Sequence, residues 1–422
     1  MIQTVSLAPG ITLRCIRQSR FKHSCLSLQF VTALEESSAA LNALLPTVLL
    51  RGCQKAPNIR AVTACLDDNY GSSVSTLVRR VGDIQTTGLY CSFLEDRFAQ
   101  EGDRVLEEAV SFLLELVLRP VTRDGVFLPE YVEGEKNNLI ATIESEMNDK
   151  RSYAAAQLRR KMCQGDSFAL SRLGTVQQVR AITPAGLHAK YRQLLSTAPV
   201  DVFYVGSAQP QEVARLLQPL AQGRGSVLPR PNQSPFLPKI PSQTVRELMD
   251  VTQGKLCMGF VTDIVTGSSL HPAMQILCAL YGGASPISKL FVQVREKQSL
   301  CYDIGAGYYG TKGILMVSAG VETRNLDRTR REVLRQLELC QKGDITRQEL
   351  DAAKESFFSS LRALSDSPGS LEGYFGTALL SGGEMDVQAY RESLERVTLE
   401  QVVQAAKSLK LHTTYCLEGE EE

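Results

Sequence analysis

The stretch Val294-Arg-Glu-Lys-Gln-Ser-Leu-Cys-Tyr302 organises the interpretation of this 422-residue chain. It places an arginine, Arg295, ahead of a tyrosine, Tyr302, just before a glycine-rich run. The pattern predicts a helix over residues 286–297, which contains Arg295, and a strand over residues 313–321, which follows Tyr302. The rest of the chain decides whether the pair is structural or functional.

The charge balance and the cysteines limit the class of protein. Lys+Arg and Asp+Glu both number 46, so the formal net charge is zero. Nucleic acid and anionic membranes bind cationic surfaces, so neither is expected as the main partner. No apolar run approaches the ~20 residues that cross a bilayer, and the N-terminal residues lack signal-peptide features. Eleven cysteines without a C-x-x-C pair predict free, mostly buried thiols, and therefore a cytoplasmic protein.

The sequence predicts two similar halves. Each half begins with strands and a helix that ends in a glycine-containing turn, and each ends with a capped helix followed by a strand. These closing elements are the helix 183–194 with the strand 200–206, and the helix 398–407 with the strand 412–417. We interpret the similarity as an internal duplication. The mixture of hairpins and helices predicts an α+β fold, in which helices pack against a mostly antiparallel sheet.

A proline-rich segment separates the halves. Residues 219–243 contain six prolines and two glycines with little periodicity, which is typical of an extended interdomain linker. The predicted domains are therefore residues 1–218 and 244–422. Within the first domain, one long polar helix is predicted over residues 130–163.

This layout resembles the pitrilysin/insulinase metallopeptidase family in its half-length form, which has two homologous domains of LuxS/processing-peptidase-like fold. The most specific match lies in the C-terminal half, where Gly282-Gly283, Ser288-Lys-Leu-Phe291, Val294-Arg-Glu-Lys297 and Tyr302 are similar to the family's Gly-Gly…Ser-Arg-Leu-Phe…Leu-Arg-Glu-Lys…Tyr pattern. The resemblance implies that Arg295 and Tyr302 contact the substrate backbone near the scissile bond, since both donate hydrogen bonds without being consumed. Spacing alone favours a surface ion pair and a tyrosine packed in a sheet; the surrounding match favours substrate contact.

The resemblance also implies a zinc motif, His-x-x-Glu-His, on the first long helix. In that motif two histidines bind zinc and the glutamate activates its water. Aligning Arg51-Gly52 with the family's Lys-Gly places Ala43, Pro46 and Thr47 at the three motif positions. Alanine, proline and threonine supply neither an imidazole nor a carboxylate. We therefore expect no metal, no general base and no catalytic residue in this chain.

The remaining ligand positions lead to the same expectation. The family's third zinc ligand, a glutamate on a later helix, should fall within residues 140–144, where the register gives Ala141 or Thr142. The histidines lie far apart in the sequence, at positions 23, 188, 271 and 412. Each is interpreted as a structural or surface histidine.

The chain thus retains one half of a composite active site. In this family, half-length subunits form a two-subunit clamshell, and in some heterodimers one subunit carries zinc while the other keeps only the Arg/Tyr pair. The chain resembles the non-catalytic bacterial members of that second kind. The resemblance implies a zinc-free, inactive subunit that supplies Arg295 and Tyr302 to a zinc-bearing partner for peptide cleavage.

Two alternatives stay open. The first is a peptide-binding or structural scaffold with no role in catalysis, which could form a homodimer when alone. The second is an active enzyme with an unrecognised site.

Overall fold

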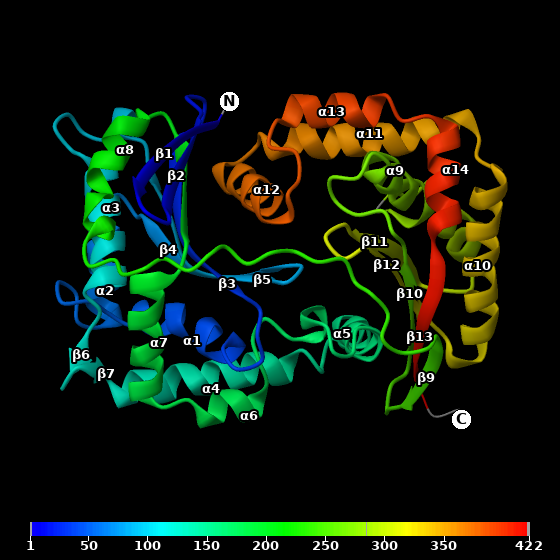
Figure 1. Cartoon of the computed structure of the whole chain (residues 1–422), viewed down its shortest axis with the longest axis horizontal. Helices are drawn as coiled ribbons and strands as arrows, with labels where there is room; N and C mark the ends of the chain where they lie inside the picture. Colours follow the sequence, from blue (N-terminus) through cyan, green and yellow to red (C-terminus); the bar gives the residue numbers. More distant parts are fainter. Residues whose placement is uncertain (1, 284, 420–422) are drawn as a thin grey trace. The chain divides into compact units, whose positions relative to one another are not determined.

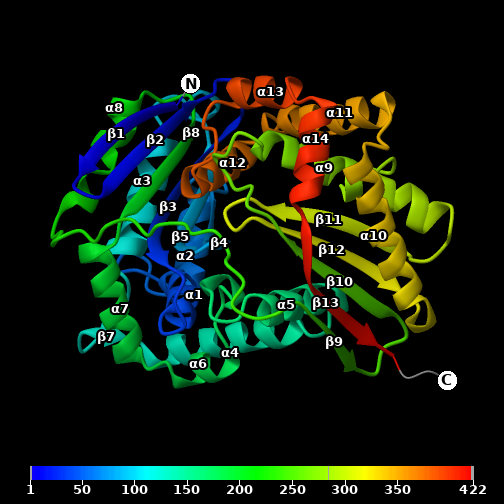
Figure 2. The same cartoon turned by 45° about the vertical axis from the view of Figure 1, so that its right-hand side comes forward.

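The chain forms two compact units in the computed structural model, which describes residues 2–283 and 285–419. Unit 1 combines most of the N-terminal half with a short stretch of the C-terminal half, Leu364–Thr377. Unit 2 combines most of the C-terminal half with a short stretch of the N-terminal half, Ser145–Ala169. Figures 1 and 2 show a sheet with covering helices in each unit. Each half of the sequence therefore contributes one segment to the unit formed mainly by the other half.

Unit 1 is built on a six-stranded sheet with the order β1-β2-β8-β3-β5-β4. Strands β2 and β8 run parallel, and the other neighbours run antiparallel. In spatial order, the strands are β1 (Ile2–Ala8), β2 (Ile11–Arg17), β8 (Val200–Gly206), β3 (His23–Ala33), β5 (Ile84–Leu94) and β4 (Ser73–Val81). A turn at residues 82–83 joins β4 and β5 as a hairpin.

Helices cover one face of this sheet with an apolar core. Leu26, Leu28 and Phe30 alternate along β3 and are buried in one cluster with residues of α1 and α3, as the period of a half-buried strand predicts. The helices assigned mainly to unit 1 are α1 (Ala39–Leu49), α2 (Ile59–Asp68), α3 (Val105–Leu118), α4 (Pro129–Ser145), α6 (Val176–Ala181), α7 (Pro184–Thr197) and α8 (Pro210–Leu216). A two-stranded ribbon, β6 (Thr122–Arg123) with β7 (Val126–Phe127), precedes α4.

The opposite face of the unit 1 sheet is polar and lies against α12 (Pro368–Ser381). Ser27 Oγ and Gln29 Nε2 on β3 donate hydrogen bonds to Oε1 of Glu372, at 2.7 and 2.8 Å. Arg79 on β4 donates from Nη1 and Nη2 to the same carboxylate, at 3.0 and 2.8 Å. The Glu372 side chain is fully buried, and a buried charge is tolerated only with such partners. These contacts fix the C-terminal segment on the sheet of the N-terminal half.

Unit 2 repeats the topology in a five-stranded sheet with the order β11-β12-β10-β13-β9. Read from β9, the strands occur as first, last, second, fourth and third along the chain, as they do in unit 1 from β2 to β4. The first and last strands are parallel in both sheets. The strands are β9 (Gln243–Leu248), β10 (Gly254–Val261), β11 (Asp303–Tyr309), β12 (Ile314–Val321) and β13 (Lys410–Glu418). The predicted α+β class with two homologous, mostly antiparallel domains is confirmed.

Helix α5 (Lys150–Met162) covers one face of the unit 2 sheet. Its Leu158 and Met162 are buried in a core cluster with Cys257, Met316 and Tyr415 of the strands. Helices α9, α10 and α14 pack against one another, and α9 and α10 also contact strands. The other helices of unit 2 are α9 (His271–Gly282), α10 (Leu326–Lys342), α11 (Arg347–Leu364), α13 (Val387–Glu395) and α14 (Leu399–Ser408).

The single long helix predicted over residues 130–163 is wrong. The chain leaves the helix after Ser145, and a new helix begins at the N-cap Asp149. The Asp149 carboxylate accepts hydrogen bonds from the backbone N–H groups of Arg151 and Ser152, at 3.1 and 3.3 Å. Such a cap satisfies helix-start N–H groups that have no partner within the helix. The break is needed because α4 and α5 pack in different units.

The proline-rich segment is extended and is held by polar contacts in both units. In unit 1, Arg230 donates two hydrogen bonds to the buried Asp201, at 3.0 and 2.6 Å. In unit 2, the N–H of Phe236 donates to the carbonyl of Lys312 at 2.9 Å. The predicted domain limits, 1–218 and 244–422, stay predictions; the compact units add the two exchanged segments.

We expect Glu372→Ala to destabilise unit 1 by about 3 kcal/mol, because it leaves the Arg79 guanidinium beside a polar sheet face without its counter-charge. Urea and thermal unfolding measure the effect. Glu338→Ala, at an exposed helical ion pair, is the control and should unfold like the wild type. Equal stability of the two variants would show that α12 is not held by this carboxylate.

Candidate functional site

Arg295 lies at the end of a π-helical turn, Phe291–Glu296. The helix predicted over residues 286–297 is therefore shorter than expected. Its last turn has hydrogen bonds between residues five apart: the N–H of Lys297 donates to the carbonyl of Val292, at 3.0 Å. Single π-turns occur frequently at functional sites. The Arg295 guanidinium lies 4.6 Å from the centroid of the Phe291 ring. Its Nε is 3.4 Å from Oε1 of Glu296, and the side chain is 42% exposed.

Tyr302 lies directly before β11, and its side chain is exposed to solvent. Its backbone N–H donates to the carbonyl of Gly320 at 2.9 Å, which fixes the residue beside the end of β12. The side chain is 60% exposed, so it is not packed in the sheet. Its hydroxyl donates to Oε1 of Glu322 at 3.2 Å. An exposed phenol with one weak partner can exchange that partner for a ligand carbonyl.

Arg295 and Tyr302 line the same pocket, which has a volume of about 450 Å³. The loop between them contains Ser299, whose φ of 50° is in the left-handed region; such a conformation is uncommon for residues other than glycine. The pocket is lined by Arg295, Glu296, Ser299, Leu300, Cys301, Tyr302, Glu322 and Asn325. The sequence prediction named the Arg/Tyr pair but missed Glu322 and Asn325. The sequence feature that could have indicated them is their position shortly after the strand that ends at Val321.

Cys301 is the only thiol among these lining residues, and it is unsuited to attack a peptide bond. Burial raises its pKa to about 11, with a further increase from Asp303 and a decrease from Arg295. The thiolate is the reactive form of cysteine, so this side chain stays protonated at neutral pH. The pocket therefore offers hydrogen-bond donors and carboxylate acceptors, and its cysteine is not an activated nucleophile.

The three zinc-motif positions lie on α1 and do not fit a metal site. Ala43 and Pro46 are buried in the helix, and the Thr47 hydroxyl donates to the carbonyl of Leu44 at 2.8 Å. In the described part of the chain, no group of three or more His, Cys, Asp or Glu side chains is arranged to hold a metal ion. No catalytic step through zinc can be derived from these residues.

Pro46, which the sequence alignment predicts to stand at the family's glutamate position, changes the hydrogen bonding of α1. Proline has no N–H, so the carbonyl of Asn42, four residues earlier, lacks its helical donor. The Thr87 hydroxyl on β5 donates to this carbonyl instead, at 2.5 Å. The Asn42 side chain also donates to Gln85 Oε1 at 2.9 Å. A buried polar network therefore joins α1 to the sheet at these residues.

The third-ligand register places Ala141 and Thr142 on α4, where both are exposed. The Thr142 hydroxyl donates to the carbonyl of Asn138 at 2.9 Å, so it bonds back to its own helix. The α4 carboxylate that does reach the end of α1 is Glu135, whose Oε1 is 3.3 Å from Nη1 of Arg51. The Glu135 carboxylate is thus paired with the Arg51 guanidinium.

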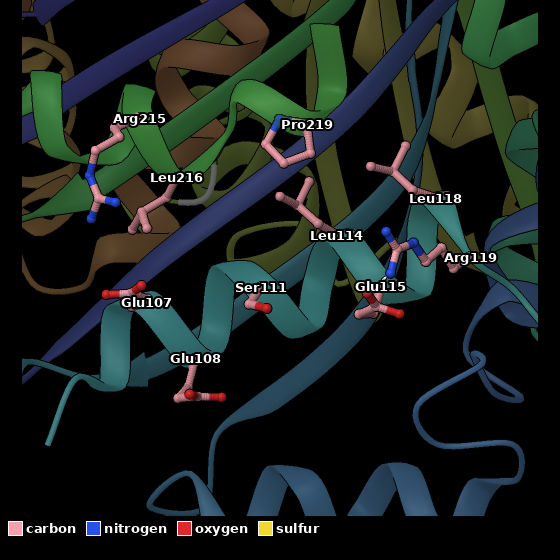
Figure 3. A pocket seen from close by; sticks show the side chains of 10 residues that line it. All are labelled: Glu107, Glu108, Ser111, Leu114, Glu115, Leu118, Arg119, Arg215, Leu216 and Pro219. Carbon is pink, nitrogen blue, oxygen red and sulfur yellow. Dashed lines mark hydrogen bonds and ion pairs between the residues drawn. The ribbon is translucent and has the colours of Figure 1, made fainter. Parts of the chain in front are cut away.

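A second hollow, of about 380 Å³, lies in unit 1 along α3 (Figure 3). Ser111 and Leu114 lie along α3 between a pair of glutamates, Glu107 and Glu108, and the residues Glu115 and Arg119 at the other end. Each of the three carboxylates has a basic partner: Arg104, Lys55 and Arg119, respectively. Paired surface carboxylates are typical of a solvated helix face, so this hollow is not used as the candidate site.

The comparisons with known proteins agree with the sequence-based recognition. Residues 181–357 match the family model described as Peptidase M16 inactive domain. Over 412 residues the chain is 28% identical to the probable inactive metalloprotease YmfF of Bacillus subtilis (strain 168), covering 98% of this chain and 96% of that protein. The predicted resemblance to a half-length, non-catalytic metallopeptidase homologue is confirmed.

Solved structures show the same fold over the full length. A conserved protein from Enterococcus faecalis V583 superposes with a TM-score of 0.90 at 27% identity, covering 100% of this chain and 99% of that one. The peptidase M16 inactive domain from Pseudomonas fluorescens has a TM-score of 0.81 at 19% identity, with 100% and 98% covered.

No helix in residues 2–283 and 285–419 is long and apolar enough to cross a membrane.

We expect Thr87→Val to lower the free energy of unfolding by about 1–2 kcal/mol, because it leaves the Asn42 carbonyl buried without a donor. The loss should shrink in a Pro46→Ala background, where residue 46 regains an N–H for that carbonyl. A double-mutant cycle measured by urea unfolding checks the coupling. Thr86→Val is the matched control, since the Thr86 hydroxyl is buried without a partner among the described residues. Equal losses in both backgrounds would contradict the compensation.

We expect the purified chain to bind zinc well below one equivalent after incubation with Zn²⁺ and desalting. The reason is that Ala43, Pro46 and Thr47 provide no imidazole or carboxylate ligand. Inductively coupled plasma mass spectrometry measures the metal, and a zinc-binding peptidase treated in parallel is the control. Stoichiometric zinc with peptidase activity would support the alternative of an unrecognised active site.

Proposed function

We propose that this chain, whose residues 181–357 match the family model described as Peptidase M16 inactive domain, acts as the non-catalytic subunit of a heterodimeric peptidase. In this proposal a homologous, zinc-bearing subunit supplies the metal and the general base. This chain supplies Arg295 and Tyr302, which contact the peptide substrate. We further propose that the complex works in the cytoplasm, given the free thiols along the chain.

One observation carries the proposal: the two donors share an exposed pocket, while the motif positions for zinc hold Ala43, Pro46 and Thr47. A chain that acted as a complete peptidase would need both sets of groups. A chain with a purely structural role would have no requirement for an arginine and a tyrosine exposed together beside a strand end. The division between intact donors and replaced ligands is what a subunit of a composite site requires.

The chemistry open to this pocket is electrostatic and positional. The guanidinium is always charged and offers several N–H donors in one plane, and the phenol offers one O–H donor. Directed at a peptide carbonyl, such donors orient the substrate and stabilise the negative charge that develops on its oxygen during hydrolysis. Glu322 accepts the hydrogen bond of the Tyr302 hydroxyl when no substrate is bound. The Arg295 guanidinium packs against the ring of Phe291.

A scaffold without a role in catalysis is the second candidate. It is favoured by β11, which is the terminal strand of the unit 2 sheet next to Tyr302. A terminal strand can pair with an extended peptide through its free backbone groups. A stable homodimer that binds peptides and associates with no zinc-bearing homologue would support the scaffold over the heterodimeric peptidase.

We expect Arg295→Ala and Tyr302→Phe in the reconstituted heterodimer to lower kcat/KM for peptide cleavage by about a hundredfold together, as the loss of donors to a developing oxyanion does in other enzymes. The subunits should associate as in the wild type, which analytical ultracentrifugation checks. Arg347→Ala, an exposed arginine elsewhere in unit 2, is the control and should leave cleavage unchanged. Cleavage at the wild-type rate by the double variant would refute the proposed role of the pair.

A further inference from the structure

Four arginines follow one face at the start of α10. Arg324 lies in the turn before the helix, and Arg328, Arg331 and Arg335 follow at spacings of four, three and four residues. Residues at these spacings share one side of a helix. All four are exposed, with Arg324 at 79% and Arg335 at 62%. We call this set the arginine stripe.

The opposite side of α10 accounts for the packing of the helix without the stripe. Leu326, Val333 and Leu337 are buried in unit 2, and α10 contacts α9, α14 and β10. The arginine stripe is therefore free for a ligand while the helix stays docked.

Ion pairs account for only half of the arginine stripe. Arg324 pairs with Glu322 at 2.8 Å, and Arg335 pairs with Glu332 at 3.1 Å. Within the described residues, Arg328 and Arg331 form no ion pair. The central two guanidinium groups thus keep their charge and their donors available.

The placement of the stripe works against the stability of α10. Positive charges near a helix N-terminus oppose the helix dipole, and like charges four residues apart repel each other. The dipole effect applies to Arg328 in the first turn of α10, and the repulsion to the two pairs of stripe residues that lie four residues apart. A charge pattern that opposes local stability points to a function for it.

The arginine stripe begins at the rim of the Arg295/Tyr302 pocket. Glu322 and Asn325 line that pocket, and Arg324 lies between them in the sequence and pairs with Glu322. A ligand that occupied the pocket and continued along α10 would meet the arginines in order. From Arg324 to Arg335 the helical rise spans roughly 16 Å, about the length of five residues of extended peptide.

We propose that the arginine stripe binds an acidic segment of the peptide, of about five residues, whose neighbouring backbone lies in the Arg295/Tyr302 pocket. Placing that backbone in the pocket rests on the proposed function; the binding of acidic peptide to the stripe does not. A peptide fits better than nucleic acid, because Asp327 and Glu338, each 58% exposed, lie on the same helix. A regular phosphate backbone would meet these carboxylates, whereas a short acidic segment can avoid them. The chain's zero net charge agrees with this choice.

Fluorescence anisotropy on the isolated full chain tests the proposal. The probes are two labelled peptides that differ only in five consecutive residues, all glutamate in one and all glutamine in the other. The glutamate peptide should bind more tightly, and its affinity should fall with added salt, as for any exposed charge contact. Arg328→Glu with Arg331→Glu should weaken its binding by about tenfold or more.

The control variant carries Arg60→Glu and Arg192→Glu, which reverse two exposed arginines on α2 and α7. It changes the net charge of the chain equally and should bind the glutamate peptide as the wild type does. The stripe variant, Arg328→Glu with Arg331→Glu, should fold as the wild type does. Carboxylates in the first turns of a helix are favourable, so its thermal unfolding temperature should equal or exceed that of the wild type.

Each outcome decides one of the two proposals. Wild-type affinity in the stripe variant, equal binding of the glutamine peptide, or stronger competition by a DNA oligonucleotide than by unlabelled glutamate peptide would overturn the stripe as an acidic-peptide site. If the stripe variant loses affinity while Arg295→Ala with Tyr302→Phe leaves heterodimer cleavage unchanged, the stripe stands and the proposed function fails. If only the latter variant impairs cleavage, the proposed function stands without the stripe.

Discussion

This fold depends on one constraint: a sheet has two faces, and both must be covered. The fully buried carboxylate of Glu372 holds the covering helix on the second face of the unit 1 sheet. In unit 1 the apolar face is covered by helices of the same half, and the polar face by α12 from the other half. The ionic and hydrogen-bonded contacts of Arg79, Ser27 and Gln29 make that polar face specific for one carboxylate. In unit 2 the corresponding cover is α5, whose contact with the sheet has an apolar centre and polar contacts from Arg151 to Asp303 and from Tyr153 to Glu247.

The same exchange explains why two duplicated halves have diverged. Their strand orders are equal once β1 is set aside, so the backbone requirements of these five strands were kept in both. The helices that close the second face differ in chemistry: α12 is held by a buried carboxylate, and α5 mainly by an apolar cluster. The helix α1 has diverged further, since Pro46 removes a backbone donor and Thr87 on the neighbouring strand supplies another. The Asn42 carbonyl thus receives its hydrogen bond from a strand and not from its own helix.

The candidate site and the arginine stripe share a physical feature: both leave polar groups without strong partners at the surface. Tyr302 holds one carboxylate at 3.2 Å, and Arg295 holds another at 3.4 Å. Folding energy is not improved by such arrangements, because exposed ion pairs contribute little. They are instead available to a ligand, and the residues that line the pocket surround the point where the π-turn, β11 and the start of α10 meet.

The sequence by itself determined the class of fold, the duplication, most elements and the absence of zinc ligands at three positions. These follow from local periodicity, caps and residue chemistry, which act over a few residues. It also named Arg295 and Tyr302, through a motif resemblance. Only the tertiary structure decided that the helix over residues 130–163 breaks, because the break is set by the two units in which its parts are buried. Glu372, Glu322 and Thr87 acquire their roles in the same way: their partners are far along the chain, and no local pattern specifies a contact across that distance.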